Sequence, residues 1–495
     1  MKLVEALSGR AGRAGLRGLL VDPEARRALG RELNALLSAP EILGALHLRH
    51  ARFRLRPDIK LSAYYDVDIR ADGSGRRAGT RAIAVVAKPK WYGRAGPSGA
   101  APEAGELEAE ARRRGLAAPF DRLTALMPSL AMSVQVSPLD PSFPQLVRLS
   151  DPEYVGQMLA RCAPTHPLPA GGYAVTSVRY QPGQRHVLRY EAADAPGQPI
   201  MFAKPYENED GSRIAAVVTQ AADWLSSRQE GVACLRPLAH VPQDAVVLYP
   251  PLSGTPLHEQ LRCSGREIGR RLEVAGQAMS VLHSAPQAFS GLLGFHSFEA
   301  EIGEVVDKSH FISALVPSAG STIDALLDRA RELYDRLPQE APAFTHGDLK
   351  MEHFWVDRRG LTLMDFDVCR LADPALDIGQ FLADLRFCHH TYGRSAVEQA
   401  QGRFLAGYAT GAPHERLVRA RLYEALELIR IAGRRLPLLD SHWEARLGRL
   451  LGWAAVLLDD LYDLRADHHR NTLGSVRRAS ASPKAAHRHP VRAAG

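Results

Sequence analysis

Two short segments carry acidic side chains in an order suited to phosphate chemistry. Residues 346–353 have the sequence HGDLKMEH and contain Asp348, and residues 363–367 have the sequence LMDFD and contain Asp365. Between them lie two β-prone runs, 353–356 and 361–364, joined by the turn-forming sequence DRRG. The hairpin that this pattern predicts brings both acids to one place. One acid could then accept a hydroxyl proton beside another that holds Mg²⁺, as phosphoryl transfer requires.

A third acidic segment makes the pattern more specific. Residues 373–377 have the sequence DPALD, and Asp373 followed by Pro374 is a favourable N-cap and N1 pair. Apolar side chains then recur at helical spacing at Ile378, Phe381, Leu382 and Leu385. A helix that contributes to the core is therefore expected after residue 374.

In this order, the three segments resemble the catalytic core of the aminoglycoside phosphotransferase and choline kinase group. The pattern of that group is H-G-D-x-x-x-x-N, then hydrophobic-D-F/W-D/E, then D-P-x-x-D. The resemblance implies an α+β, protein-kinase-like bilobal fold, with a β-rich small lobe and an α-helical large lobe. It also implies ATP and Mg²⁺ as cofactors.

The resemblance also assigns roles to individual residues. Asp348 is expected to be the catalytic base and Asp365 the metal ligand that bridges the phosphates. Asp377 would be a buried acid that braces the catalytic loop, together with His346. Lys350 could neutralise the moving phosphoryl group, as the equivalent lysine does in protein kinases.

His353 departs from the family pattern. It stands where the family usually has Asn, a second metal ligand. Imidazole is a softer nitrogen ligand than Mg²⁺ prefers. Two interpretations therefore remain open: either His353 is a second metal ligand, or it only orients Asp348.

The segment upstream provides candidates for nucleotide binding. Residues 178–190 are expected to form a strand, a tight turn at Pro182-Gly183 and a second strand, and residues 200–204 form the next strand, which ends at Lys204. By its place in this order, Lys204 is the candidate phosphate lysine. The turn has one glycine, Gly183, where protein kinases have three, so its backbone amides would form a weak phosphate cradle.

The next helix and strand complete the expected small lobe. Residues 212–227 are predicted to be helical, and Gln220 lies where the family has an acid that pairs with the lysine. Glutamine can hydrogen-bond a lysine but cannot neutralise it. Residues 245–257, which include Tyr249, fit the linker strand whose backbone would hold adenine. His283 ends the following predicted helix and is interpreted as a helix-end or core histidine.

The N-terminal part of the chain contains an internal echo of the small lobe. Residues 53–57 with Tyr65 match residues 178–182 with Tyr190, and residues 87–89 match residues 203–205. We expect a second β-rich half-lobe near residues 40–145, although convergent strand patterning is the alternative. Some large bacterial phosphotransferases of this group have such an extension, followed by a segment resembling residues 138–146 that we expect to dock on the small lobe.

Composition limits the class of protein. The 495 residues are 45% hydrophobic, enough for two or three domains. No apolar run approaches the roughly 18 to 20 residues of a membrane span, and no signal-peptide region follows the N-terminus, so a cytoplasmic location is expected. Five scattered cysteines without metal-ligand spacing are expected to be reduced thiols.

The net charge of +7 lies almost entirely in the C-terminal tail. Residues 465–495 contain one acid, Asp467, and seven basic residues, and they have few large apolar side chains, so disorder is expected there rather than nucleic-acid binding. The expected division is an accessory region (1–149), a small lobe (150–250), a large lobe (251–464) and this tail. The seven basic residues are Arg465, Arg470, Arg477, Arg478, Lys484, Arg488 and Arg492.

The sequence thus predicts an ATP-dependent phosphotransferase that moves the γ-phosphoryl group to a hydroxyl of a small molecule, such as an aminoglycoside, a sugar or an amino alcohol. The alternative is a nucleotide-binding pseudokinase that acts as a scaffold or regulator, which Gln220, His353 and the single-glycine turn favour. The acceptor and the oligomeric state stay open. Four acids could meet a cationic substrate, but solvated helix faces explain them more simply: Asp384, Glu398, Glu424 and Glu427.

Overall fold

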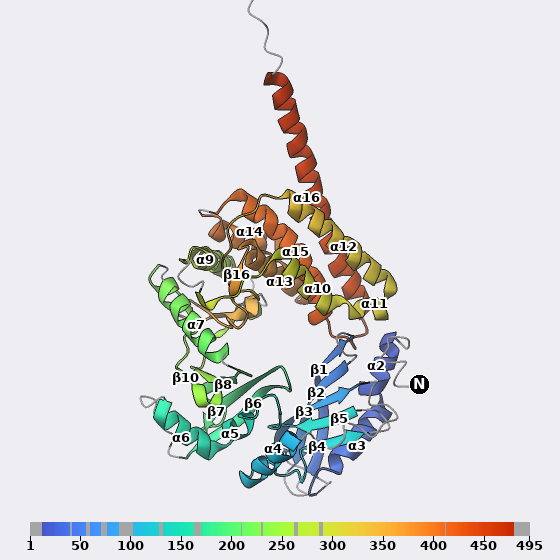
Figure 1. Cartoon of the computed structure of the whole chain (residues 1–495), viewed down its shortest axis with the longest axis vertical. Helices are drawn as coiled ribbons and strands as arrows, with labels where there is room; N and C mark the ends of the chain where they lie inside the picture. Colours follow the sequence, from blue (N-terminus) through green and yellow to red (C-terminus); the bar gives the residue numbers. More distant parts are fainter. Residues whose placement is uncertain are drawn as a thin grey trace, which may run out of the picture.

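The computed structural model describes residues 12–39, 42–55, 60–70, 77–88, 102–127, 132–162, 169, 171–208, 210–228, 231–261, 266–286, 291–410 and 412–479. They form an N-terminal region, a β-rich small lobe and a large lobe made mostly of helices (Figure 1). The predicted α+β class is confirmed.

The N-terminal region is a five-stranded antiparallel sheet with helices. Its strand order is β1-β2-β3-β5-β4. Alternate residues of β5 are buried, as expected for a strand with one face on a core. The elements are α2 (Gly12–Leu20), α3 (Pro23–Asn34), β1 (Leu43–Arg54), β2 (Lys60–Arg70), β3 (Arg77–Ala87), α4 (Pro102–Arg113), β4 (Thr124–Met127) and β5 (Met132–Val136).

The small lobe has a second five-stranded antiparallel sheet, in the order β10-β11-β8-β7-β6. Helix α7 packs on it and buries apolar residues at helical spacing, among them Ile214, Val218 and Leu225. The elements are α5 (Leu146–Leu149), α6 (Pro152–Cys162), β6 (Tyr173–Gln181), β7 (Arg185–Ala192), β8 (Pro199–Pro205), α7 (Asp210–Ser226), β10 (Ala239–Val241), the 3₁₀ turn η4 (Pro242–Asp244) and β11 (Val246–Tyr249).

The two sheets share a three-strand pattern. Strands β1, β2 and β3 form an antiparallel meander, and so do β6, β7 and β8. Residues 56, 57 and 89 of the proposed echo lie outside the described residues. The segment 138–146 contacts the small lobe, as expected: the Tyr180 hydroxyl donates to the Leu139 carbonyl at 2.6 Å and the Gln145 amide donates to the Tyr206 carbonyl at 2.7 Å.

The large lobe surrounds one central helix, α13, in which every residue from Ala375 to Leu385 is buried. Helices α15 and α14 pack against it. The elements are α8 (Leu257–Gln260), α9 (Arg266–His283), α10 (Phe298–Ser309), α11 (Phe311–Leu315), α12 (Pro317–Arg336), α13 (Ala375–Thr391), α14 (Val397–Tyr408), α15 (His414–Arg434) and α16 (Trp443–Ala479).

Short strands in the large lobe carry the loop that contains the sequence motif. The predicted hairpin is present, since β14 (Phe354–Val356) pairs with β15 (Leu361–Leu363), and residues Met351–His353 form a 3₁₀ turn, η6, before it. The hairpin belongs to a four-stranded sheet in the order β12-β14-β15-β9, in which β12 is Thr255–Pro256 and β9 is Val232–Cys234. A separate two-stranded sheet pairs β13 (Ala343–Thr345) with β16 (Arg370–Ala372).

The C-terminal segment differs from the expected tail. Helix α16 continues through residue 465 and ends at Ala479, and Figure 1 shows it extending away from the other helices. The physical reason is that arginine and alanine, which make up six of the fifteen residues from 465 to 479, are good helix formers. Residues 480–495 lie outside the described part of the chain. Among the described helices, none has the length and apolarity needed to span a bilayer.

Candidate active site

The loop that carries Asp348 connects β13 to the hairpin, and its backbone requires a glycine. Gly347 has φ +80°, and a Cβ atom there would lie 2.3 Å from the Val368 carbonyl oxygen. A side chain is therefore excluded both by conformation and by space. This close approach fixes the loop against the segment that follows Asp365.

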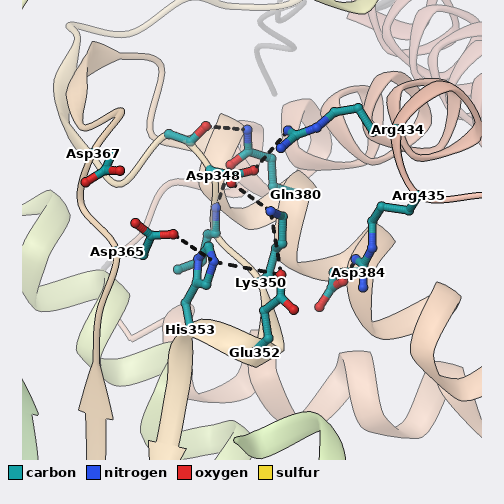
Figure 2. Close-up of polar contacts among 12 residues, drawn as sticks. Asp348, Lys350, Glu352, His353, Asp365, Asp367, Gln380, Asp384, Arg434 and Arg435 are labelled. Atoms are coloured by element: carbon teal, nitrogen blue, oxygen red, sulfur yellow. Dashed lines mark hydrogen bonds and ion pairs between the residues drawn. The ribbon is translucent and has the colours of Figure 1, made fainter. Parts of the chain in front are cut away.

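Three polar side chains of α13 hold the same loop from the other side. Asp377, Gln380 and Asp384 lie at helical spacing on one face of α13. They accept hydrogen bonds from the backbone N–H groups of residues 346, 347, 349 and 351, at 2.7, 2.8, 2.9 and 2.7 Å. Figure 2 shows Gln380 and Asp384 beside the loop. The position of Asp348 is thus set by consecutive contacts along a buried helix.

Asp377 is completely buried and has a third partner. His283 Nε2 lies 3.0 Å from its carboxylate, and His283 Nδ1 lies 2.7 Å from the Tyr408 hydroxyl. Burial favours the neutral acid, but the hydrogen bond and charge of His283 lower the pKa of Asp377 below its ordinary value. His283 is therefore a buried helix-end residue that supports Asp377.

Asp348 lies between two cations. Its carboxylate is 2.7 Å from Lys350 Nζ and 3.4 Å from Arg434 Nη1, as drawn in Figure 2. Burial favours the neutral acid, but the positive charges of Lys350 and Arg434 outweigh it and lower the pKa of Asp348. Asp348 is therefore a carboxylate at neutral pH and can accept a proton.

Lys204 bridges the small lobe to the acids after β15. Its Nζ lies 2.7 Å from Asp365 Oδ1 and 2.5 Å from Asp367 Oδ2. Burial opposes its charge, but the two carboxylates raise the pKa of Lys204. Asp365 has φ +67°, a conformation that is costly for a residue with a side chain and is concentrated at functional sites. The Tyr206 hydroxyl donates to Asp367 at 2.9 Å.

His353 faces the same acids. Its Nε2 lies 3.6 Å from Asp365 Oδ2, and its buried Nδ1 has no hydrogen-bond partner among the described residues. Burial lowers the pKa of His353 to about 4, against which Asp365 acts only partly. The imidazole is therefore neutral at pH 7 and keeps a lone pair available.

The donor set fits a Mg²⁺ ion that is shared with phosphates. The described residues contain no group of three or more His, Cys, Asp or Glu side chains that could hold a metal ion. Mg²⁺ usually takes only one or two carboxylates and completes its coordination with water and phosphate oxygens. Asp365 and Asp367 both pair with the Lys204 ammonium group. A Mg²⁺ ion could replace that group as the cation beside the two carboxylates.

The nucleotide candidates are only partly brought together. Tyr249, at the end of β11, is near Lys204 because β11 and β8 are neighbours, and burial raises the pKa of Tyr249 to about 12. Gly183 lies in the β6–β7 turn, where its N–H donates to Asp140 Oδ2 at 2.8 Å. Gln220 is exposed on α7, about 120° around the helix from the buried Ile214. The expected contact of Gln220 with Lys204 is replaced by the acids Asp365 and Asp367.

Several residues that shape this site are not predicted from the sequence. Asp367 belongs to the D-F-D segment, and its acidity was the available signal. Gln380 and Asp384 follow Asp377 by three and seven residues, a spacing that could have indicated a shared helix face. Arg434 lies 86 residues from Asp348, and we find no sequence signal for it.

Three of the four acids considered for a cationic substrate are not on solvated faces. Asp384, Glu424 and Glu427 are buried. They pair with arginines because buried charge requires a partner: Asp384 with Arg435, Glu424 with Arg386 at 2.9 Å, and Glu427 with Arg430. The expectation of solvated acids is therefore wrong for these three. Glu398 is mostly exposed and lies 3.7 Å from Arg386.

Comparison with known proteins supports the sequence resemblance. Residues 215–420 match the model of the phosphotransferase enzyme family. No curated protein matches the chain.

Among solved structures, the chain is similar to a choline/ethanolamine kinase family protein from Mesorhizobium loti (17% identity, 62% of this chain and 94% of that one, TM-score 0.41). It is also similar to spectinomycin phosphotransferase in complex with ADP and spectinomycin (12%, 63% and 97%, TM-score 0.40). A third similar structure is amicoumacin kinase in complex with AMP-PNP and Ca²⁺ (15%, 63% and 94%, TM-score 0.43).

The matched range contains all three acidic segments on which the resemblance was predicted, including Asp348, Asp365 and Asp377. The described fold agrees with it, because a β-rich lobe precedes a helical lobe that carries the loop and hairpin. The predicted resemblance is therefore confirmed over residues 215–420, which match the phosphotransferase enzyme family, and the described fold is of the predicted α+β class.

Proposed function

We propose that the protein is a kinase that transfers the γ-phosphoryl group of ATP to a hydroxyl of a small molecule. The observation that carries this proposal is that the ionised acid Asp348 and the Lys204–Asp365 pair both lie near His353, at the junction of the two lobes (Figure 2). The accompanying division is an accessory region (1–149), a small lobe (150–250) and a large lobe (251–464).

Lys204 and Asp365 form the nucleotide side of the proposed site. Lys204 would leave its carboxylate partners to contact the α- and β-phosphates, and the backbone near Tyr249 would hold adenine. Asp365, with Asp367 and His353 beside it, would hold Mg²⁺. When bound, that ion offsets the negative charge of the phosphates and of the transition state.

Asp348 and Lys350 form the transfer side. The acceptor hydroxyl gives its proton to Asp348, which is available because its pKa is lowered by Lys350 and Arg434. Lys350, 2.7 Å from Asp348, neutralises charge on the phosphoryl group as it moves. His346 and Asp377 keep the loop in place through buried hydrogen bonds.

A nucleotide-binding protein without turnover is the second candidate. It is favoured by the Gly183 N–H, which is bonded to Asp140, and by the exposed position of Gln220. Both features remove groups that would otherwise serve ATP in an active kinase.

A cytoplasmic location is part of the proposal. Cys162, Cys234, Cys369 and Cys388 are free thiols. Free thiols agree with a reducing compartment, in which ATP is also available.

The test is ADP release from Mg²⁺-ATP with a panel of alcohols, together with a nucleotide-binding titration. Lys204→Met should weaken Mg²⁺-ATP binding by about tenfold or more, since a charged hydrogen bond contributes roughly 1.5–3 kcal/mol. Lys308→Met, at an exposed lysine of α10, is the matched control and should leave binding unchanged. Mg²⁺-ATP binding without ADP release on any alcohol would favour the second candidate. If Lys204→Met keeps both Mg²⁺-ATP binding and ADP release, the kinase and the nucleotide-binding candidates are both contradicted.

A further inference from the structure

A crevice beside the proposed base is formed by three parts of the chain. It has a volume of about 540 Å³. The N-terminal region contributes residues of β1 and β2, the small lobe contributes β6, and the large lobe contributes the catalytic loop and the end of α15. Its basic lining residues are Arg49, Arg52, Arg179, Lys350, Arg434 and Arg435.

The crevice lies on the acceptor side of Asp348. Lys350 and Arg434, which line it, are the two cations that contact the Asp348 carboxylate. Lys204, Asp365 and Tyr249, the nucleotide candidates, are not among its lining residues. A molecule in the crevice could therefore present a hydroxyl to Asp348 while the nucleotide lies on the other side.

The acids near the crevice do not balance its cations. Arg49 pairs with Asp66, Arg435 with Asp384, and Lys350 and Arg434 share Asp348. Glu352 is the acid in the lining, and it lies 3.8 Å from Lys350.

Within the described part of the chain, no carboxylate oxygen lies close enough to Arg52 or Arg179 to form an ion pair. Arg52 donates to the Gln184 side chain at 2.6 Å and to His50 at 3.2 Å. Both guanidinium groups reach water, yet they lie within a crevice. Partial desolvation and the nearby arginines lower the pKa of Arg52 and of Arg179, and the charges of Asp365 and Glu352 oppose this shift only partly at Arg179. Positive charge is thus in excess here.

Arginines placed in this way suit an anion. The planar guanidinium matches the oxygens of phosphate and carboxylate in two-point hydrogen bonds, and a bound anion would remove the mutual repulsion. A cationic substrate such as an aminoglycoside would be repelled by the positive charge of these arginines. The acids Glu424 and Glu427 cannot help it, because they are buried and paired with arginines.

We propose that the acceptor is a small alcohol that already carries a phosphate or carboxylate group, held in this crevice by Arg52 and Arg179. This inference rests on the proposed kinase function and names its substrate class. In the reaction, the acceptor oxygen forms a bond to the γ-phosphorus while the bond to the ADP oxygen breaks. The acceptor proton goes to Asp348, and ADP leaves with the electron pair. The N-terminal region then supplies part of the acceptor site.

The test compares alcohols that differ in charge. ADP release by the full-length protein is measured with a hexose, a hexose phosphate, a hydroxycarboxylate and kanamycin. We expect kcat/KM for the hexose phosphate or the hydroxycarboxylate to exceed that for the hexose by about tenfold or more. The comparison of the hexose phosphate with the hydroxycarboxylate shows whether the crevice prefers a phosphate or a carboxylate group. A preference for kanamycin or the neutral hexose would overturn the proposal.

The double variant Arg52→Gln/Arg179→Gln tests the residues. It should raise the KM of the anionic alcohol by about tenfold or more, while kcat and Mg²⁺-ATP affinity stay within about twofold. Arg26→Gln/Arg27→Gln, at exposed positions of α3, makes the same charge change elsewhere in the N-terminal region and should have no effect. An unchanged KM in the crevice variant would overturn the proposal. Weaker Mg²⁺-ATP binding would also overturn it, because the crevice would then serve the nucleotide.

A binding measurement separates this inference from the kinase proposal. With Mg²⁺-AMP-PNP present, inorganic phosphate should bind to the parent protein by calorimetry and bind at least about tenfold more weakly to the crevice variant. If no alcohol in the panel is phosphorylated but phosphate still binds in this way, the anion site stands and the kinase function fails. If Mg²⁺-ATP supports turnover but phosphate does not bind, the kinase function stands and the anion site fails.

Discussion

Replacing Asp377 by asparagine perturbs the support of the catalytic loop without changing its shape. The Asp377 carboxylate is completely buried and accepts hydrogen bonds from the N–H groups of His346 and Gly347, at 2.7 and 2.8 Å. Asparagine offers one acceptor oxygen and one NH₂ group. One of the two backbone N–H groups must therefore face another donor in Asp377→Asn.

The expected cost follows from these contacts. One charge-assisted hydrogen bond is lost and one buried N–H is left without an acceptor, and each change costs roughly 1 to 3 kcal/mol. Asp377→Asn should therefore destabilise the loop by about 2 to 6 kcal/mol. The cost should depend on pH, because the pKa of Asp377 is lowered in the folded protein. Its stabilising contribution is present above the unfolded pKa of about 3.9 and is lost as pH falls through the folded value.

Because the chain has several lobes, a single melting temperature would average over them. Hydrogen exchange in a peptide covering residues 343–353 reports the loop directly. At pH 7 it should be faster in Asp377→Asn by roughly 30-fold or more, which corresponds to 2 kcal/mol, and kcat should fall. Asp328→Asn is the control, since Asp328 is exposed and makes only a surface pair with Arg331. Equal exchange in Asp377→Asn and the parent would refute the bracing argument.

The remaining predictions concern the chemical groups. Asp348→Asn should lower turnover by roughly 10²- to 10⁴-fold with little change in nucleotide affinity, and unchanged ADP release would remove Asp348 from its role. Asp365→Asn should weaken Mg²⁺-ATP binding as well as turnover, as a titration with and without Mg²⁺ would show. If His353 ligates metal, His353→Asn should shift the Mn²⁺/Mg²⁺ activity ratio toward Mg²⁺, whereas an identical ratio would exclude coordination. Asp140→Ala should lower the KM for ATP, because it releases the Gly183 N–H for a phosphate oxygen, and an unchanged KM would dissociate that turn from nucleotide binding.

The hairpin and its acids could be predicted because local rules determine them. The DRRG turn and its flanking β-prone runs specify β14 and β15, and the structure pairs Phe354 with Leu363. Once the hairpin forms, Asp348 and Asp365 lie close together in space although they are far apart in the sequence. The helix after Pro374 follows from equally local signals of capping and apolar spacing.

Contacts that depend on tertiary packing could not be predicted in this way. Arg434 reaches Asp348 only because α15 packs on α13. Asp384 was interpreted as solvated because acids on helices usually are, but its helix lies at the centre of the large lobe. Its partner, Arg435, is 51 residues away in the sequence, so no local sequence pattern could identify the pair.

The single glycine of the β6–β7 turn shows how a local interpretation can mislead. A turn with one glycine was expected to be a weak phosphate cradle, as judged from the backbone alone. In the structure, Asp140 Oδ2 accepts the Gly183 N–H at 2.8 Å and lies 2.7 Å from Nε2 of the buried His186. The turn is thus held by a carboxylate from the segment that links it to the N-terminal region. Arg52 of the N-terminal region also donates to Gln184 in the same turn, so side chains from outside the small-lobe sheet hold the turn, and its own residues give no sign of them.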